Sequence, residues 1–212
     1  MTAPLLIIGA GGHAKVLVEA LLASSAVIAG VVDADPAMAG QALLGVPVLG
    51  DDKFVQEFPP DEIRLVNGLG SVGLPVRRKE LFERFKTLGY SFAKVVHPSA
   101  VIASDVELGE GAQIMAGAVI QPGSRIGSNV IVNTRASVDH DCRIGEHVHL
   151  APGVTLSGGV RIGDSSHIGT GATLIQGINT GARCLVAAGS VVIRDINENT
   201  TVYGVPAREA KQ

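Results

Sequence analysis

The sequence IMAGAV IQPGSR IGSNVI VNTRAS VDHDCR IGEHVH, residues 114–149, decides the fold of this chain. Each six-residue unit in it begins with isoleucine or valine. The same spacing runs from Val96 to Val192, and of the seventeen positions that it defines only Thr180 is not Val, Ile or Leu. A period of six fits neither an amphipathic helix nor an alternating strand. It predicts a parallel β-helix built from hexapeptide repeats, in which each coil covers the apolar face of its neighbour.

The fourth residue after each aliphatic position is nearly always small or β-branched, which suits a tight corner between short strands. Cys142 and Cys184 both occupy this position. They are 42 residues, or seven repeats, apart along the chain, so a disulfide between them is not expected. We predict that both are buried as small apolar side chains.

Length, composition and charge limit the possible domain number, partners and location of the protein. The 212 residues allow one large domain or two small ones. Aromatic content is only 3% and tryptophan is absent, as expected of a thin core of Val, Ile and Leu. The net charge of −3 gives no electrostatic support for nucleic-acid binding. No apolar stretch is long enough to span a membrane, and the first residues lack a secretory signal, so a cytoplasmic protein is expected.

A different pattern precedes the repeats. Residues 5–8 form an apolar strand that leads into the Gly-rich residues 9–14, a helix-like segment and a second strand ending at Asp33. This order is typical of a Rossmann-like unit, whose glycines and helix N-terminus can approach a phosphate. A dinucleotide is one alternative and a turn without ligand is another. Because the domain ends near residue 94, a mononucleotide or nucleotide-sugar fits better, and we expect domains of 1–94 and 95–212.

The rest of the first domain predicts a helix over residues 51–58, a third strand over 63–66 and a helix over 75–88. Gly68 and Gly70 form a second Gly-rich turn after the third strand. Arg77, Arg78 and Lys79 begin the last helix, where they are expected on a solvated face, with a phosphate contact from Arg78 as the alternative.

The whole chain resembles bacterial nucleotide-sugar N-acetyltransferases of the sialic acid O-acetyltransferase-like, hexapeptide-repeat family. The resemblance rests on the Gly-rich loop with His13, Asp33, the Gly68-Leu69-Gly70 turn, His97-Pro98-Ser99-Ala100, residues 133–149 and the ending Gly204-Val205-Pro206-Ala207-Arg208. It implies a left-handed coil, a homotrimer, a UDP-4-amino-4,6-dideoxy sugar on the first domain and acetyl-CoA on the coils.

The resemblance also implies roles for individual residues. His140 lies between Asp139 and Asp141, and the family match makes His140 the general base and Asp141 its orienting partner. The expected substrate-binding residues are Gly9, Gly11, Gly12, His13, Asp33, Asp35, Gly68, Gly70, Asn133 and Asp139. The expected acetyl-CoA-binding residues are His149, Gly158, Gly169, Thr170, Ala188 and Arg208.

Three alternatives stay open at this point. A sugar O-acetyltransferase of the sialic acid type is the nearest, and a non-catalytic nucleotide-sugar-binding scaffold is the second. The third is a metal enzyme, since His149 and His167 are one coil apart and stack. The γ-class carbonic anhydrases, β-helix proteins that bind zinc, have two histidines five residues apart, which this sequence lacks, so we expect no metal.

Overall fold

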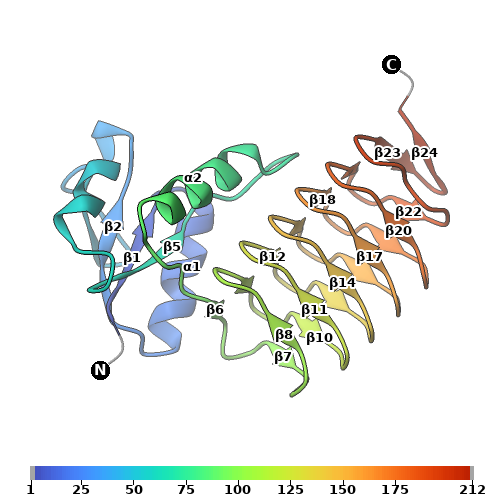
Figure 1. Cartoon of the computed structure of the whole chain (residues 1–212), viewed down its shortest axis with the longest axis horizontal. Helices are drawn as coiled ribbons and strands as arrows, with labels where there is room; N and C mark the ends of the chain where they lie inside the picture. The colour runs from blue at the N-terminus through green and yellow to red at the C-terminus, as the bar shows by residue number, and fades with distance from the viewer. Residues whose placement is uncertain (1–2, 211–212) are drawn as a thin grey trace.

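The computed structural model describes residues 3–210, in which an α/β domain precedes a prism of stacked coils (Figure 1). The α/β domain contains β1 (Leu5–Ile8), α1 (Gly12–Ala23), β2 (Ile28–Val32), η1 (Pro36–Met38), β3 (Ala42–Leu43), β4 (Val46–Gly50), η2 (Asp52–Glu57), β5 (Arg64–Asn67) and α2 (Val76–Thr87). The sheet order is β3-β4-β2-β1-β5, with only β3 antiparallel to its neighbour.

The two helices pack on opposite faces of this sheet. All four residues of the central strand β1 are buried, as expected for a parallel strand covered on both sides. The cluster under α1 includes Met115 and Ile131 of the coils, so α1 lies between the sheet and the prism. The cluster under α2 contains Phe82, Phe85 and Phe92. The predicted helix over 75–88 is confirmed as α2.

The predicted helix over 51–58 is the 3₁₀ helix η2. Asp51 begins it, because its side chain accepts a hydrogen bond from the Lys53 amide at 2.9 Å. Pro59 and Pro60 follow directly, and proline cannot continue a helix.

The coils consist of two-residue strands that pair in parallel with strands one coil away, 18 residues along the chain. The first face, called the cleft face, contains β6 (Val95–Val96), β9 (Gln113–Ile114), β12 (Ile131–Val132), β15 (His149–Leu150), β18 (His167–Ile168) and β21 (Leu185–Val186). The second, the uncharged face, contains β7 (Val101–Ile102), β10 (Val119–Ile120), β13 (Ser137–Val138), β16 (Thr155–Leu156), β19 (Thr173–Leu174) and β22 (Val191–Val192). The third, the arginine face, contains β8 (Glu107–Leu108), β11 (Arg125–Ile126), β14 (Arg143–Ile144), β17 (Arg161–Ile162) and β20 (Asn179–Thr180).

The second residue of each of these strands points into the prism, which explains the six-residue period. The inward residues form one continuous aliphatic core. Thr180 is the exception here too, because it is buried and its hydroxyl has no hydrogen-bond partner among residues 3–210. Cys142 and Cys184 are buried free thiols, as predicted, and burial raises the pKa of each.

The first residue of each strand points outward, and the faces differ in these residues. The uncharged face presents Val101, Val119, Ser137, Thr155, Thr173 and Val191. The arginine face presents Glu107, Arg125, Arg143, Arg161 and Asn179. Among the described residues, no helix is both long and apolar enough to cross a membrane.

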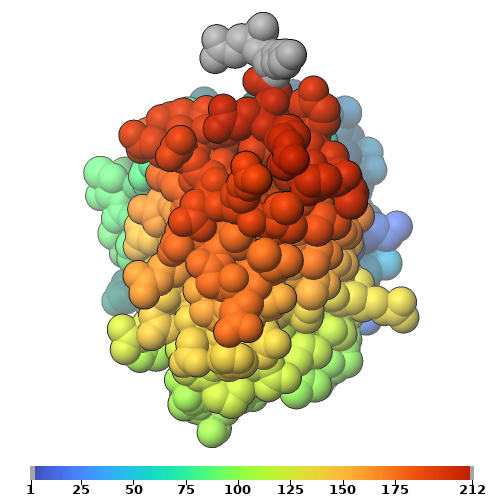
Figure 2. All heavy atoms as spheres, turned by 90° about the vertical axis from the view of Figure 1, so that its right-hand side faces the viewer, coloured from blue at the N-terminus to red at the C-terminus, as the bar shows by residue number. Residues whose placement is uncertain are grey.

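A hairpin of β23 (Thr201–Gly204) and β24 (Ala207–Glu209) closes the far end of the prism. Figure 2 looks onto this end, where the last coils and the hairpin form the top of the surface and earlier coils follow below. The α/β domain sits at the opposite end, against the first coils of the cleft face (Figure 1).

Candidate functional site

A cleft of about 720 Å³ lies between the α/β domain and the cleft face. This volume is in the range of small-molecule sites. One wall comes from the start of α1 and the Gly-rich turn after β5, and the other from the corners and strands of three successive coils. The residues lining it include Gly11, Gly12, His13, Gly68, Gly70, Ser71, Arg77, Asn133, His149, Ala151, Pro152, His167 and Thr170.

The Gly-rich loop leaves the N-terminus of α1 open toward this cleft. Gly11 is the N-cap residue of α1 and gives no side-chain cap, and the first turn has no acidic residue. The free amides there can bind an anion such as a phosphate. Nothing among the described residues lies within 4 Å of where a Cβ on Gly11 or Gly12 would stand, so a ligand has room to approach.

Two glycines are required for the loop and the second turn to meet. A Cβ on Gly68 would lie 2.7 Å from the carbonyl oxygens of Ile8 and Gly9. Gly9 itself has a φ of +102°, which other residues resist. The close approach fixes the ends of β1 and β5 side by side at the cleft.

Asp33 supports the loop from behind. Its Oδ2 accepts a hydrogen bond from the Ala10 amide at 2.5 Å, and its Oδ1 accepts one from the Asp35 amide at 2.8 Å. Asp35 in turn accepts one from the Ala37 amide at 2.9 Å and begins η1. Both carboxylates, expected at the nucleotide, are therefore engaged with backbone amides in this chain.

His13 is held by a side chain from the coils. Its Nε2 lies 2.8 Å from Gln113 Oε1, while Gln113 Nε2 donates to the Asn67 carbonyl at 2.8 Å. The second bond orients the Gln113 amide, so the His13 proton is on Nε2 and Nδ1 keeps a free lone pair. Burial, with a smaller effect of the Arg78 charge, lowers the pKa of His13 to about 4. His13 is thus a neutral acceptor on the cleft wall.

The expectation that Arg78 lies on a solvated face is wrong, because Arg78 is only 1% exposed. Its Nη1 donates to the carbonyls of Asn67 and Leu69 at 2.9 and 2.8 Å. Its Nε donates to the carbonyl of Asn129 on the coils at 3.3 Å. Burial lowers the pKa of Arg78 to about 9, which leaves it charged at neutral pH. The alternative, a phosphate contact, does not fit either, because the guanidinium joins the second turn to the prism.

The neighbouring polar side chains complete this junction. Asn67 Nδ2 donates to Asn129 Oδ1 at 3.1 Å, and Asn129 Nδ2 lies 3.0 Å from His147 Nδ1. His147 is buried against Phe82, and burial lowers its pKa. Sequence reasoning named none of these as site residues, since each partner lies far away along the chain.

His149 and Asn133 lie together on the coil side of the cleft. His149 Nδ1 is 2.8 Å from Ser71 Oγ, and His149 Nε2 is 3.1 Å from Asn133 Nδ2. Burial is the main reason that the pKa of His149 falls to about 2, so this ring is neutral. Ser71 was not predicted, although it directly follows the Gly68–Gly70 turn that was.

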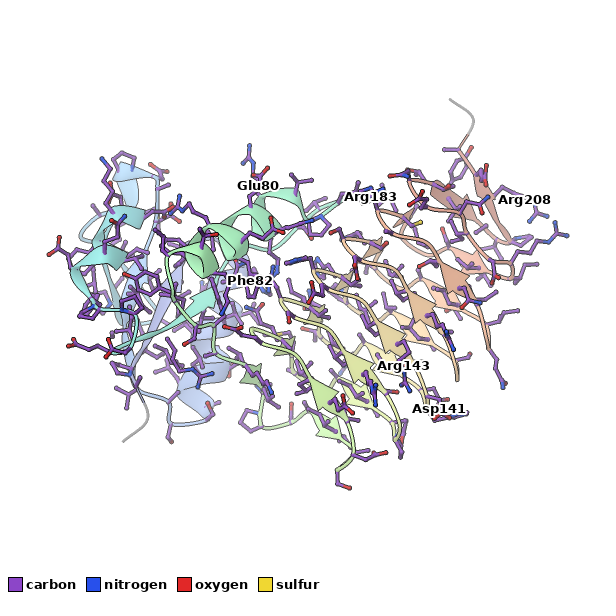
Figure 3. All side chains as sticks on the ribbon, viewed as in Figure 1. Glu80, Phe82, Asp141, Arg143, Arg183 and Arg208 are labelled. Carbon is purple, nitrogen blue, oxygen red and sulfur yellow. The ribbon has the colours of Figure 1, made fainter. Side chains whose placement is uncertain are left out.

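His140 lies outside this cleft, at the corner between β13 and β14. Its Nδ1 donates to Asp141 Oδ2 at 2.8 Å, and its amide donates to Asp139 Oδ1 at 2.8 Å. The hydrogen bond that His140 donates to Asp141 is the main reason that the pKa of His140 is raised, and the charges of both aspartates add to this effect. The His140 side chain is 55% exposed. Figure 3 shows Asp141 at the edge of the prism, far from Phe82 on α2.

Gly158 belongs to the same corner as His140. A Cβ on Gly158 would lie 2.5 Å from His140 Nε2, so the imidazole rests directly on this glycine. Because Nδ1 is bonded to the carboxylate, Nε2 is the nitrogen that can accept a proton. The structure thus groups His140, Asp141, Asp139 and Gly158 in one place and His13, Asn133, His149 and Thr170 in another.

The remaining predicted acetyl-CoA residues lie further along the prism. Gly169 packs on the next coil, where its Cβ would lie 2.6 Å from the Ala188 amide nitrogen. Arg208 is exposed on the C-terminal hairpin, at the far end from the cleft (Figure 3). Within one chain, Arg208 therefore meets neither His140 nor the cleft.

The predicted stacking of His149 and His167 is confirmed, since the two residues pair in register on neighbouring strands. Their ring centroids are 4.9 Å apart and the planes meet at 89°. Among residues 3–210, no group of three or more His, Cys, Asp or Glu side chains is placed to bind a metal ion.

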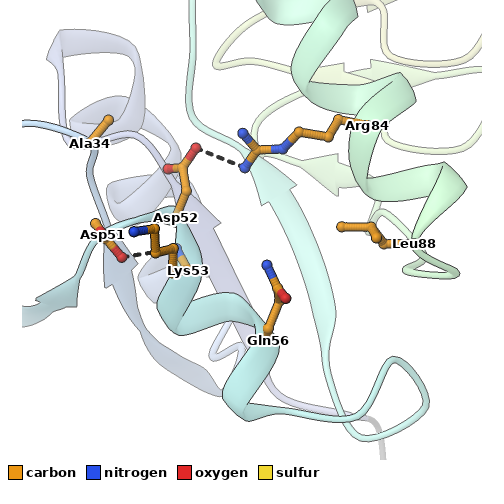
Figure 4. A pocket seen from close by; sticks show the side chains of 7 residues that line it. All are labelled: Ala34, Asp51, Asp52, Lys53, Gln56, Arg84 and Leu88. Atoms are coloured by element: carbon orange, nitrogen blue, oxygen red, sulfur yellow. Dashed lines mark hydrogen bonds and ion pairs between the residues drawn. The ribbon is translucent and has the colours of Figure 1, made fainter.

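A second hollow of about 380 Å³ lies on the α/β domain between η2 and the end of α2 (Figure 4). Arg84 crosses it to Asp52, with 2.9 Å between guanidinium and carboxylate. It contains no histidine and no open helix N-terminus, so it offers less for catalysis than the cleft.

The comparisons with known proteins cover both domains. Residues 4–85 match the PglD N-terminal domain, and residues 123–158 and 141–176 match the bacterial transferase hexapeptide (six repeats). Comparison with curated protein sequences gives no match.

Several solved structures match over the full length. PerB from Caulobacter crescentus, solved with CoA and GDP-perosamine, is 42% identical, with 100% of this chain and 99% of that chain covered and a TM-score of 0.91. The acetyltransferase domain of PglB from Neisseria gonorrhoeae, solved with acetyl coenzyme A, is 36% identical, with 99% and 100% covered and a TM-score of 0.91. WeeI from Acinetobacter baumannii is 27% identical, with 99% and 100% covered and a TM-score of 0.87. These matches confirm the predicted fold class, a Rossmann-like α/β domain followed by a left-handed parallel β-helix.

Proposed function

A perosamine N-acetyltransferase from Caulobacter crescentus is 41% identical over 100% of this chain, so the chain belongs to the family of bacterial nucleotide-sugar N-acetyltransferases that join a PglD N-terminal domain to hexapeptide repeats. We propose that it acetylates the amino group of a nucleotide-linked 4-amino-4,6-dideoxy sugar. Acetyl-CoA is the acetyl donor. Membership of this family confirms the resemblance predicted from the sequence. The observation that carries the proposal is the pairing of His140 with Asp141, which leaves one imidazole nitrogen free to act as a base.

His140 is assigned as the general base. An amine that attacks a thioester carbonyl must lose a proton, and His140 Nε2 is the acceptor. The proton passes to Nε2 as the amine nitrogen bonds to the carbonyl carbon; the carbon–sulfur bond then breaks, and the imidazolium returns the proton to the CoA sulfur. Asp141 holds the ring through Nδ1 and stabilises its charged form.

Gly158 supports the same step. Its missing side chain leaves room for the His140 ring, and its amide is proposed to face the thioester oxygen as negative charge develops there. The Gly9–Gly12 loop and the second turn are proposed to bind the nucleotide diphosphate, with Asp33 and Asp35 shaping the loop. Gly169, Thr170, Ala188 and Arg208 remain the proposed contacts along the CoA chain.

We propose a homotrimer, because a single chain keeps the base apart from the cleft. His140 lies at the corner between the uncharged and arginine faces, whereas His13 and Asn133 lie at the cleft face. The outward residues of the uncharged face carry no charge, as suits a surface covered by another copy. In a closed ring of three, the His140 corner of one protomer can reach the cleft of the next.

The test is an acetylation assay with purified protein, acetyl-CoA and a panel of nucleotide sugars, read by release of free CoA. The panel contains UDP- and GDP-linked 4-amino-4,6-dideoxy sugars, together with the matching sugars that carry a hydroxyl instead of the amine. We propose the UDP-linked amino sugar as acceptor. The GDP-linked one is the second candidate, because the 42% identical PerB was solved with GDP-perosamine.

The outcome also separates the other function classes. Turnover of the hydroxyl sugars alone would assign an O-acetyltransferase, and binding without turnover on any sugar would assign a scaffold. Since acetyl-CoA and nucleotide sugars are cytoplasmic metabolites, we propose that the protein acts in the cytoplasm.

A further inference from the structure

Both ring nitrogens of His149 are already used within the chain. The Asn133 amide is oriented by its Oδ1, which accepts from the Thr134 amide at 2.8 Å. Asn133 Nδ2 is therefore the donor to His149 Nε2, and the His149 proton on Nδ1 is donated to Ser71 Oγ. Within the chain, His149 thus positions the second Gly-rich turn against the coil through both ring nitrogens.

His167, one coil further from the α/β domain, is in the opposite situation. It is 7% exposed, and its ring meets that of His149 edge to face. Its Nδ1 is buried and has no hydrogen-bond partner among residues 3–210. Its Nε2 also has no partner in that range, but this atom is not fully buried, and His167 lines the cleft.

This environment decides where the His167 proton lies. Burial lowers the pKa of His167, so the ring is neutral at physiological pH and carries one proton. A buried N–H with no acceptor loses a full hydrogen bond to water, and such orphan donors are rarer than orphan acceptors. The proton therefore lies on Nε2, and His167 presents an N–H donor to the cleft.

We propose that His167 is a further ligand-binding residue, whose Nε2–H donates a hydrogen bond to a carbonyl oxygen of the acyl-CoA arm. The proposal rests on the proposed function of the cleft. It goes beyond it because neither the repeat pattern nor the predicted acetyl-CoA set assigned a ligand contact to this residue.

Three features favour the acyl-CoA arm over the nucleotide-sugar. His167 lies on β18, away from the Gly-rich loop that would hold the diphosphate. The cleft residues beside it are Ala151, Pro152 and Thr170, which carry no charge for a phosphate. A thioester or amide carbonyl accepts a hydrogen bond and carries no charge, and so it matches a neutral N–H donor. On the other wall, the free Nδ1 of His13 is an acceptor, which matches an amine or hydroxyl of the sugar.

The experiment compares His167→Phe and His167→Gln with the wild-type protein. Phenylalanine keeps an aromatic ring against His149 but removes the donor, whereas glutamine restores an N–H at similar reach. Calorimetry should show roughly tenfold weaker acetyl-CoA binding in His167→Phe, the effect of leaving one carbonyl unpaired. Nucleotide-sugar affinity should stay unchanged, and His167→Gln should recover much of the lost affinity.

Repeating the titrations with free CoA identifies the carbonyl. A loss seen only with acetyl-CoA assigns the contact to the thioester, and a loss shared by CoA assigns it to an amide of the pantetheine arm. Wild-type acetyl-CoA affinity in a folded His167→Phe protein, checked by its melting temperature, would overturn the proposal. So would equal losses in both variants, which would indicate packing alone. Failure of the wild-type protein to release CoA with any sugar would instead count against the proposed function.

Discussion

Replacing Arg78 by methionine should destabilise the junction between the two domains. Methionine keeps the apolar stem of the side chain but removes its donors to the carbonyls of Asn67, Leu69 and Asn129. The Asn67 carbonyl keeps a second donor, Gln113 Nε2, at 2.8 Å. Among the described residues, the other two carbonyls have no other donor in these contacts, so the buried Asn129 acceptor and the part-buried Leu69 acceptor become unpaired.

The size of the effect follows from that count. The buried Asn129 acceptor left unpaired costs about 1–3 kcal/mol, and the part-buried Leu69 acceptor, which water at the cleft can reach, adds less. Part of this is offset, because the substitution also removes a buried charge whose Nη2 has no partner among residues 3–210. We expect a net loss of about 1–3 kcal/mol in the free energy of unfolding. For a chain of this size that corresponds to a melting temperature lower by roughly 2–12 °C.

Urea and thermal unfolding followed by circular dichroism measure this loss. The matched control is Arg77→Met, one residue earlier on the same helix, where the side chain is exposed and the change should stay within about 0.5 kcal/mol. If the Arg78 and Arg77 variants unfold at the same urea concentration, the guanidinium does not join the domains as described.

Five further predictions concern the proposed activity and assembly. Gly11→Val should fold normally, since its Cβ meets nothing within 4 Å. Calorimetry should show that this variant loses nucleotide-sugar binding while acetyl-CoA still binds, and unchanged sugar affinity would contradict the loop assignment. His140→Ala should lower turnover by about 10²–10⁴-fold with both substrates still bound, and near-full turnover would rule out a general base there. Asp141 raises the pKa of His140, and the base acts when it is neutral. Asp141→Asn should therefore move the acid limb of the pH–rate profile to lower pH, and a limb that stays in place would point to the substrate amine. Gly158→Ala places a methyl group 2.5 Å from His140 Nε2, so it should displace the ring and reduce turnover by roughly a hundredfold, with little change in melting temperature. Wild-type turnover in this variant would show that the ring can move freely. Light scattering should give the mass of three chains, and a monomer at working concentration would exclude the shared site.

The β-helix could be predicted from sequence because every coil offers the same environment. A residue such as Ile126 or Ile144 is inward for one local reason, its place in the repeat, and no distant contact changes that. The same holds for the strand, loop and helix at the start of the chain, where apolar residues and glycines follow each other within a few positions. The His149–His167 stack was predictable for this reason, since one coil is a fixed number of residues.

The junction could not be predicted, because its contacts join residues that are far apart in the chain. Arg77 and Arg78 look equivalent in sequence, yet α2 turns one to solvent and the other against Asn129, 51 residues later. The role of His149 depends in the same way on Ser71, 78 residues earlier. Such pairs become visible only once the α/β domain is docked on the coils.

The uninterrupted pairing of the coils limits how this chain can change in length. Each strand meets its partner 18 residues away, and three strands make one full turn. An insertion of six residues would move every later segment by one face, and a single residue would turn the buried aliphatic side chains outward. The prism can therefore be lengthened only by whole turns, and the distance between the Gly-rich loop and the C-terminal hairpin can change only in steps of one turn.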